Sequence, residues 1–515
     1  MSAVYRAIVC ATGLFVVACS PNRAAKPETS FKTDAASFSQ IALPTLKPVQ
    51  FGLPTTKVSS SYSLDLFRRY APPPPWMWDS TVIEPEFYSV EIADFTGDGR
   101  DDIATIVGGA SPEHVHLLYV LPQLSSGELG PAIPYPLNSY EGGPYYNFPF
   151  AITRADLNQD GISDLVLTRG RSISLLTADG TGSFRSQTYS ADRYFPLPAV
   201  VLDVNRDGLQ DVVAFTTLVP PERGDPRNGF VVHYGDGRGG IAGHSEFRTS
   251  GTVPNDSEQG YSLATGDLNS DGYPDLVARI SEFDFNAQIW RHVVSIHLHD
   301  KHQSFLPAIK INAVLTTGIE LLMFDDVVVA DLTRDGLDDL VVTAESHLRQ
   351  EVHVLPQNPD GSIDGAAHIK SIQPNPSAVD IGDLNGDGYL DLLVAHSNYG
   401  SVGYLLNGQN GLQDQAVRAI QTGGAGIGRN SQAIGDLNGD GCNDAVVVAQ
   451  WSSMAVLHGM GCTTRTRVTG GNAPSRVATG SERSAASAGA FLVPAPGALH
   501  RSVPQLRGSS RDWHH

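Results

Sequence analysis

The sequence predicts an all-β protein folded as a seven-bladed β-propeller, and three observations lead to this prediction. A nine-residue motif, D-x-[NT]-x-D-G-x-x-D, occurs seven times, starting at residues 94, 156, 203, 267, 331, 383 and 436. Short apolar, β-branched runs precede and follow it, as in 327–330 and 339–342, and such runs are typical of buried strands. The motif starts are 62, 47, 64, 64, 52 and 53 residues apart, which is close to the length of one four-stranded propeller blade.

The repeat that begins before the sixth motif shows how one blade is composed. Apolar runs flank the motif at 377–382 and 392–395, a third run covers 402–406, and a final strand is expected at about 415–420. The turn residues 397–400 separate the second run from the third. Four strands per repeat and seven repeats predict a closed ring of seven blades.

The motif itself indicates a divalent cation site. It places oxygen-bearing side chains at positions 1, 3, 5 and 9, and a glycine at position 6 where the backbone reverses. Hard oxygen donors favour Ca²⁺ over zinc or copper. The loops are not EF-hands, because position 12 is never acidic and the following residues have a strand pattern. The alternative is a metal-free Asx turn at each blade corner, since Asp, Asn and Gly favour turns.

The seven loops with their flanking strands resemble the FG-GAP/VCBS repeat family, whose best-known members are the seven-bladed head domains of integrin α subunits. The resemblance covers about residues 50 to 470, and Val107-Gly108-Gly109-Ala110 is similar to the GAP element of that family. It implies a seven-bladed β-propeller with one calcium loop per blade. It implies little about activity, because adhesins, lectin-like proteins and many proteins of unknown role share this fold.

The resemblance also implies the metal ligands, which are the side chains at positions 1, 3, 5 and 9 and the backbone carbonyl at position 7. In chain order these are Asp94, Thr96, Asp98, Arg100, Asp102; Asp156, Asn158, Asp160, Ile162, Asp164; Asp203, Asn205, Asp207, Leu209, Asp211; Asp267, Asn269, Asp271, Tyr273, Asp275; Asp331, Thr333, Asp335, Leu337, Asp339; Asp383, Asn385, Asp387, Tyr389, Asp391; and Asp436, Asn438, Asp440, Cys442, Asp444. Up to seven Ca²⁺ ions are therefore expected. Thr96 and Thr333 replace the Asn of the other loops, so we expect weaker binding at these two sites.

The charge of the chain is consistent with this interpretation. The formal net charge is −20, and the seven loops contain 21 Asp residues at positions 1, 5 and 9. Seven Ca²⁺ ions would neutralise most of that excess, so the acidity need not indicate a cationic partner. A nucleic-acid partner is not expected, because such proteins show a basic stripe.

The first 19 residues have the features of an export signal. Arg6 gives a thin positive region, residues 7–18 are apolar and too short to span a bilayer, and residues 16–20 resemble the lipobox of bacterial lipoproteins. That resemblance implies lipidation of Cys19, a membrane contact through the lipid anchor alone, and an outer-membrane or cell-surface location. The alternative is ordinary cleavage after Ala18, which would give a periplasmic or secreted protein.

The rest of the chain divides by composition. Residues 20–48 predict a flexible tether, 49–470 the propeller and 471–515 a disordered tail. Residues 49–66 are a candidate for a strand that closes the ring on the last blade, which the sequence does not settle. Cys442 and Cys462 both belong to the last repeat, and in an exported protein we expect them to form a disulfide.

Longer connections suggest where a ligand binds. Those at 140–150, 219–228 and 281–292 are expected on the face opposite the calcium loops, where integrins also bind partners. The candidate contact residues there, each of which could instead pack within its loop, are Tyr145, Tyr146, Arg223, Arg227, Trp290 and Arg291.

Catalysis has little support in the sequence. No G-x-S-x-G, H-E-x-x-H or phosphate-binding glycine loop occurs. His297 and His299 alternate along one strand and are interpreted as solvated, with a transition-metal site as the alternative. We therefore expect a non-enzymatic binding or adhesion protein for a glycan or protein ligand. The alternatives are a glycosidase or lyase on the same propeller, and a non-catalytic envelope scaffold.

Overall fold

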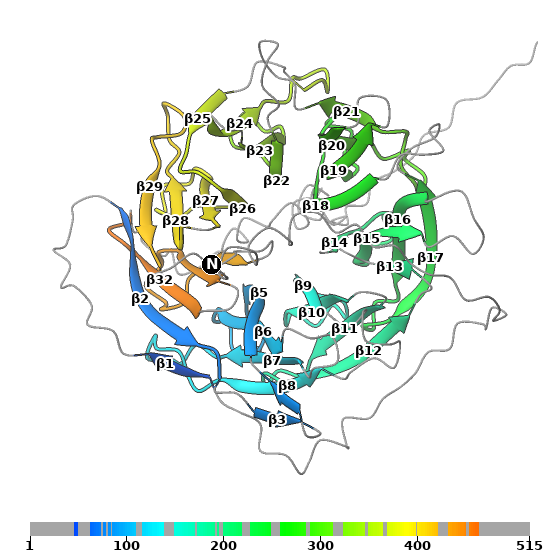
Figure 1. The fold of residues 1–515 in the computed structure, drawn as a ribbon. Coiled ribbons are helices and arrows are strands. Elements are labelled where there is room, and N and C mark those ends of the chain that lie inside the picture. The colour runs from blue at the N-terminus through cyan, green and yellow to red at the C-terminus, as the bar shows by residue number, and fades with distance from the viewer. Residues whose placement is uncertain are drawn as a thin grey trace, which may run out of the picture.

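The computed structural model describes residues 46–49, 62–73, 76–78, 81–83, 85–109, 116–137, 149–169, 172–190, 193–194, 199–218, 227–248, 258–284, 289–312, 323–345, 349–363, 368–397, 399–420, 431–449 and 453–462. Every regular element in these stretches is a β-strand. None of them is a helix of the length and hydropathy that a bilayer crossing requires. Seven small antiparallel sheets form a ring, as the sequence predicts (Figure 1).

Each sheet is one blade, and its strands follow one another outward from the ring axis. Blades 1 to 3 comprise β5 (Pro85–Ala93), β6 (Asp102–Gly109), β7 (His116–Leu121) and β8 (Ile133–Leu137); β9 (Pro149–Ala155), β10 (Asp164–Arg169), β11 (Ser172–Ala178) and β12 (Phe184–Ser190); and β14 (Val200–Leu202), β15 (Asp211–Leu218), β16 (Arg227–Gly235) and β17 (Ile241–Arg248), with β13 (Arg193–Tyr194) also on β15.

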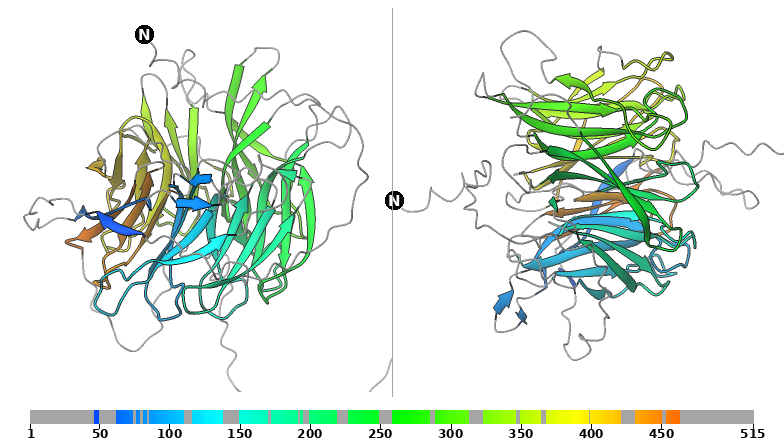
Figure 2. Two further views of the ribbon diagram at one scale, coloured as in Figure 1. Left: turned by 60° about the horizontal axis from the view of Figure 1, so that its bottom comes forward. Right: turned by 90° about the vertical axis from the view of Figure 1, so that its right-hand side faces the viewer.

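Blades 4 to 6 repeat this order without exception. They comprise β18 (Glu258–Gly266), β19 (Asp275–Asp284), β20 (Ile289–His297) and β21 (Ile309–Asn312); β22 (Met323–Ala330), β23 (Asp339–Glu345), β24 (Gln350–Leu355) and β25 (His368–Ser371); and β26 (Pro376–Gly382), β27 (Asp391–His396), β28 (Ser401–Leu405) and β29 (Ala416–Ala419). The blades stack around the ring as seen from the side in Figure 2.

Blade 7 joins the two ends of the described chain. Its inner strands are β30 (Gln432–Gly435), β31 (Asp444–Ala449) and β32 (Ser453–Met460), and its outer strand is β2 (Ser63–Ala71), which pairs with β32 from Ser63↔Met460 to Tyr70↔Met454. β1 (Lys47–Val49) extends the sheet beyond β2. The N-terminal region therefore closes the ring, although the strand lies at 63–71 and only partly within 49–66. A separate hairpin pairs β3 (Trp76–Trp78) with β4 (Thr81–Ile83).

The hydrophobic core lies between neighbouring blades. In one cluster, Val277 and Val294 of blade 4 pack with Phe324 and Val342 of blade 5. Another joins blade 1 to blade 7, with Phe87 and Val446 both fully buried. The strands following the motifs are apolar on both faces because each sheet is covered on both sides by a neighbouring blade.

Three of the candidate contact residues occupy strands. Arg227 begins β16, and Trp290 and Arg291 lie on β20 opposite Phe283 and Glu282 of β19. These positions belong to strands of long B–C hairpins, so the expectation that these three residues lie in inserted loops is wrong. Tyr145, Tyr146, Arg223 and Cys19 lie outside the described residues, as do residues 1–45 and 463–515.

His297 and His299 are buried, so their interpretation as solvated is wrong. Their exposed fractions are 1% and 2%. His297 is hydrogen-bonded to Ser295, and the Nε2 atom of His299 lies 2.8 Å from the carbonyl oxygen of Val204 in the neighbouring blade. His299 therefore contributes to the contact between two blades.

Another buried histidine, His396, predicts acid sensitivity. His396 is fully buried, and its Nδ1 atom lies 3.2 Å from the Pro374 carbonyl oxygen. The Gln415 side chain accepts the Gln373 N–H through Oε1, so its Nε2 donates to Nε2 of His396 at 2.9 Å. A proton on Nε2 of His396 would therefore point at the Gln415 N–H, which is also a donor. Burial also lowers the pKa of His396 to about 4.

We expect stability to fall as the pH drops from about 6.5 to about 4. Unfolded histidine has a pKa of about 6.5, so below that pH the unfolded state takes up the proton first, which costs up to about 3 kcal/mol for one such residue. Gln415→Glu supplies an acceptor for protonated His396 and should flatten this loss. Urea unfolding at several pH values measures the stability of the wild type and of the Gln415→Glu variant. Parallel stability profiles of the two proteins would contradict the role given to His396.

Candidate functional site: seven acidic loops on one face

The seven motifs form the A–B loops and adopt one backbone conformation. The position-6 glycine has a φ between 80° and 89° in all of them. The residue at position 4 also has a left-handed backbone conformation, with φ between 55° and 74°. Glycine occupies position 4 in three loops, whereas Gln159, Arg206, Ser270 and Arg334 occupy it in the others. The motif shows the need for a left-handed backbone at position 6, because glycine is constant there. It does not show the same need at position 4, because the residue type varies there.

Two hydrogen bonds recur in every loop. The position-6 N–H donates to Oδ2 of the position-1 Asp at 2.7 to 3.2 Å. The position-7 N–H donates to Oδ1 of the position-5 Asp at 2.8 to 3.0 Å. In the five loops with Asn at position 3, its Oδ1 accepts the position-5 N–H at 2.8 to 3.0 Å. These bonds fix the acidic side chains to the loop that carries them.

The residues present fit a calcium ion. The Oδ1 atoms of Asp156 and Asp383, both at position 1, are buried and accept no hydrogen bond, and a buried carboxylate oxygen without a partner is costly. The other donors offered by the loop are carboxylate, amide and carbonyl oxygens, which Ca²⁺ prefers. Within the described part of the chain, no three Asp, Glu, His or Cys side chains group closely enough to hold a metal. An ion would therefore need the position-3 side chain and the position-7 carbonyl as well.

The position-9 carboxylates tie each loop to its own blade. All seven are fully buried: Asp102, Asp164, Asp211, Asp275, Asp339, Asp391 and Asp444. Their Oδ2 atoms accept the position-2 N–H at 2.9 to 3.0 Å. Their Oδ1 atoms accept the N–H of a residue at or just after the end of the third strand at 2.7 to 3.2 Å. We call this pair of contacts the position-9 staple; the role of these residues as metal ligands stays a prediction.

Burial raises the pKa of the position-9 carboxyl groups despite these N–H donors. The values are about 6 for Asp102, Asp164 and Asp211, about 7 for Asp275 and Asp391, and about 8 for Asp444. Removal from water penalises the charged form more than the N–H donors stabilise it.

Residues outside the predicted ligand set connect neighbouring loops. In four of the seven loops, the position-8 side chain reaches the backbone at position 1 of the preceding loop: Asp101 accepts the Asp436 N–H at 3.0 Å, and Gln210 accepts the Asp156 N–H at 2.7 Å. The Asp338 carboxylate accepts the Asp267 N–H at 2.9 Å, whereas the Asn443 amide donates to the Asp383 carbonyl at 2.8 Å. The contact of Asp101 closes the ring from blade 1 to blade 7.

Polar side chains after the third strand complete these seams. Gln123 donates to the Asp436 carbonyl at 2.9 Å, Gln357 to the Asp267 carbonyl at 3.1 Å and Asn407 to the Leu332 carbonyl at 2.7 Å. A Gln, His or Asn immediately beyond an apolar third strand was the available sequence signal for them.

In two loops a cationic side chain lies next to a carboxylate. Arg100 contacts Asp98 in the first loop, and Lys301 lies 3.3 Å from Asp271 in the fourth. Such a cation competes with a metal ion for the position-5 carboxylate. We therefore expect weaker Ca²⁺ binding at the fourth loop, which its sequence motif did not predict, as well as at the first.

The last blade carries a covalent crosslink. Cys442 of the seventh loop is bonded to Cys462, with Cα atoms 5.8 Å apart. The bond links that loop to the segment that follows β32.

The comparisons with known families agree with this geometry. The FG-GAP-like repeat matches residues 156–214, 331–394 and 383–447, and the FG-GAP repeat matches 259–288. These matches include six of the seven loops, and the first loop has the same backbone conformation and hydrogen bonds. The chain is an FG-GAP-repeat β-propeller. The sequence-based assignment of the family and fold is thereby confirmed.

Solved structures similar to this FG-GAP propeller are distant. An Agrocybe aegerita lectin that recognises non-reducing terminal N-acetylglucosamine is 16% identical, with a TM-score of 0.40, and the match covers 71% of this chain and 91% of the lectin chain. The WD40 domain of Toxoplasma gondii coronin is 10% identical, with a TM-score of 0.44, and the match covers 81% of this chain and 90% of the coronin chain. The exotype rhamnogalacturonan lyase YesX is 13% identical, with a TM-score of 0.34 and 71% of both chains covered. These likenesses are too distant to indicate a shared ligand. No curated protein matches the chain.

Proposed function

We propose that this FG-GAP propeller is an exported, calcium-stabilised binding protein at a bacterial cell surface, with a glycan or protein as its ligand. Calcium at the A–B loops has a structural role in this proposal: it neutralises carboxylates that the loop backbone already holds together. Lipidation of Cys19 would supply the membrane anchor. The protein acts by binding and does not turn its ligand over.

The observation that carries the proposal is the contrast between the two ends of the blades. Every A–B loop has the same conformation and the same two internal hydrogen bonds. Connections at the other end vary in length, from two residues between β10 and β11 to twelve between β29 and β30. Variable loops on a rigid scaffold are a common arrangement for recognition.

A glycan array probed in calcium, followed by an assay for released sugar, tests this function. We expect binding without sugar release, and reduced binding in chelator because the loops lose their ions. Sugar release from a bound glycan would instead assign a glycosidase or lyase. If no glycan is retained, capture of a purified surface protein is the remaining expected result, and failure of both would leave a structural scaffold.

A further inference from the structure

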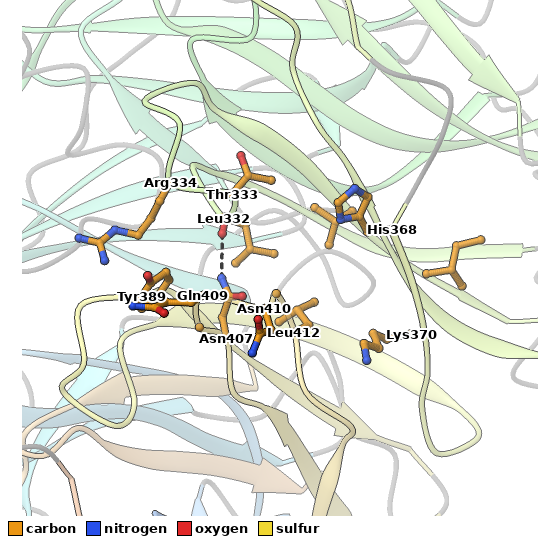
Figure 3. A pocket seen from close by; sticks show the side chains of 14 residues that line it. Leu332, Thr333, Arg334, His368, Lys370, Tyr389, Asn407, Gln409, Asn410 and Leu412 are labelled. Atoms are coloured by element: carbon orange, nitrogen blue, oxygen red, sulfur yellow. Dashed lines mark hydrogen bonds between the residues drawn. The ribbon is translucent and has the colours of Figure 1, made fainter.

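A cleft of about 780 Å³ lies at the seam between blades 5 and 6, beside the fifth and sixth loops. Its residues come from five segments: the fifth loop, the sixth loop, strands β24 and β25, and the turn after β28. Figure 3 shows Arg334 and Tyr389 at one end of the cleft and His368 and Lys370 at the other. The volume is within the range of about 300 to 1,000 Å³ typical of small-molecule sites.

The cleft differs in charge from the rest of the chain. The protein has a formal net charge of −20, yet none of the fourteen residues lining the cleft is Asp or Glu. Arg334, Lys370 and His368 are all among them. A concave site that contains the cationic side chains of Arg334 and Lys370, on an acidic protein, favours an anionic ligand.

The uncharged residues of the cleft narrow the ligand class. Leu332, Val354 and Leu412 give it an apolar part, while Gln409 and Asn410 contribute exposed amide groups that both donate and accept hydrogen bonds. An apolar surface with flexible amides suits the C–H faces and hydroxyl groups of a sugar. Charge and amides together point to a sugar that carries a carboxylate.

The structure holds the walls of this cleft in place. The guanidinium carbon of Arg334 lies 4.5 Å from the centre of the Tyr389 ring, so the two loops are joined by a cation–π contact. Asn407 donates to the Leu332 carbonyl at 2.7 Å, shown by the dashed line in Figure 3. Lys370 lies 3.5 Å from Asp414, which is fully exposed. Because such surface pairs are weak, a ligand carboxylate can replace Asp414.

We propose that the cleft binds a short oligosaccharide bearing a carboxylate, which pairs with Lys370 while Gln409 and Asn410 bind its hydroxyl groups. This inference rests on the proposed binding function and names a ligand class for it. The cleft lies on the calcium-loop face, so it is a separate site from any that the variable connections form at the opposite end of the blades.

Calorimetry with matched saccharides in calcium tests the cleft. The probes are sialyllactose with lactose, which lacks the sialic-acid residue, and cellobiouronic acid with cellobiose, which has CH₂OH in place of the carboxylate. We expect at least one acidic sugar to bind at least about tenfold more tightly than its neutral counterpart. Lys370→Gln should weaken that binding roughly tenfold, as expected for one charge-assisted hydrogen bond. Gln409→Ala should weaken binding of the acidic sugar by about threefold.

Lys310→Gln is the matched control. Lys310 is exposed on β21, the outer strand of blade 4, and Lys370 is half-buried on β25, the outer strand of blade 5. The control should bind like the wild type. The proposal is overturned if acidic and neutral sugars bind equally, if both lysine variants lose the same affinity, or if none of the probes binds. It is also overturned if tri-aspartate, a carboxylate-bearing peptide, binds more tightly than the acidic sugars. If glycans on the array bind while the Lys370 variant is unaffected, only the cleft assignment fails and the proposed function remains.

Discussion

Removing calcium with a chelator should lower the melting temperature of this protein by on the order of 10 °C. At a free concentration tenfold above its dissociation constant, each ion stabilises the folded state by about 1.4 kcal/mol, so seven ions contribute about 10 kcal/mol. Without them, the position-1 and position-5 carboxylates of each loop lose their counter-charge. The buried Oδ1 atoms of Asp156 and Asp383 also have no hydrogen-bond donor to replace the metal.

Scanning calorimetry with calcium, with chelator and after calcium is restored measures this effect. Asp387→Ala removes one donor from one loop and should lower the melting temperature by only a small fraction of the chelator effect. Asp360, which lies outside the seven loops in a connection of blade 5, is the control: Asp360→Ala should leave the calcium dependence unchanged. An identical melting curve with and without chelator would show that the loops are metal-free turns.

The second large effect distinguishes the position-9 Asp from the position-5 Asp of the same loop. Asp391→Asn should destabilise the protein by about 2 to 3 kcal/mol whether or not calcium is present. Leu384 and Asn407 donate their N–H groups to the two oxygens of Asp391 at 2.9 and 2.7 Å. An Asn amide has one oxygen, so one buried N–H would face an NH₂ group. Asp387→Asn should destabilise the protein only when calcium is present, because its main expected loss is the metal.

Urea unfolding of both variants, with calcium and with chelator, gives the comparison. The position-9 staple predicts that the Asp391 variant loses stability in all conditions. If its loss instead disappears in chelator, as for Asp387, position 9 acts through the metal alone and the staple has no independent role. Circular dichroism before unfolding checks that both variants retain the β fold.

Much of the fold could be predicted because it depends on local pattern. The strand after each loop needs β-branched residues, the loop needs Gly at position 6 and short acidic side chains, and these requirements recur every 47 to 64 residues. Each blade forms from consecutive strands, so the motif count gave the number of blades. The closing strand β2 was harder to place, because its partner β32 lies nearly 400 residues away and its sequence, SLDLFRRYA, has no regular alternation.

The sequence alone determined the repeat, the seven blades and the acidic loops, because strand and turn preferences act between near neighbours. Only the tertiary structure decided which residues join the blades and where a cleft forms. Asp101 and Asp436 meet across 335 residues, and the cleft combines five segments of two blades. The residue types at these seams vary from blade to blade, since any side chain that can reach the neighbouring backbone suffices. A repeating pattern cannot reveal contacts of that kind; the spatial arrangement of the ring creates them.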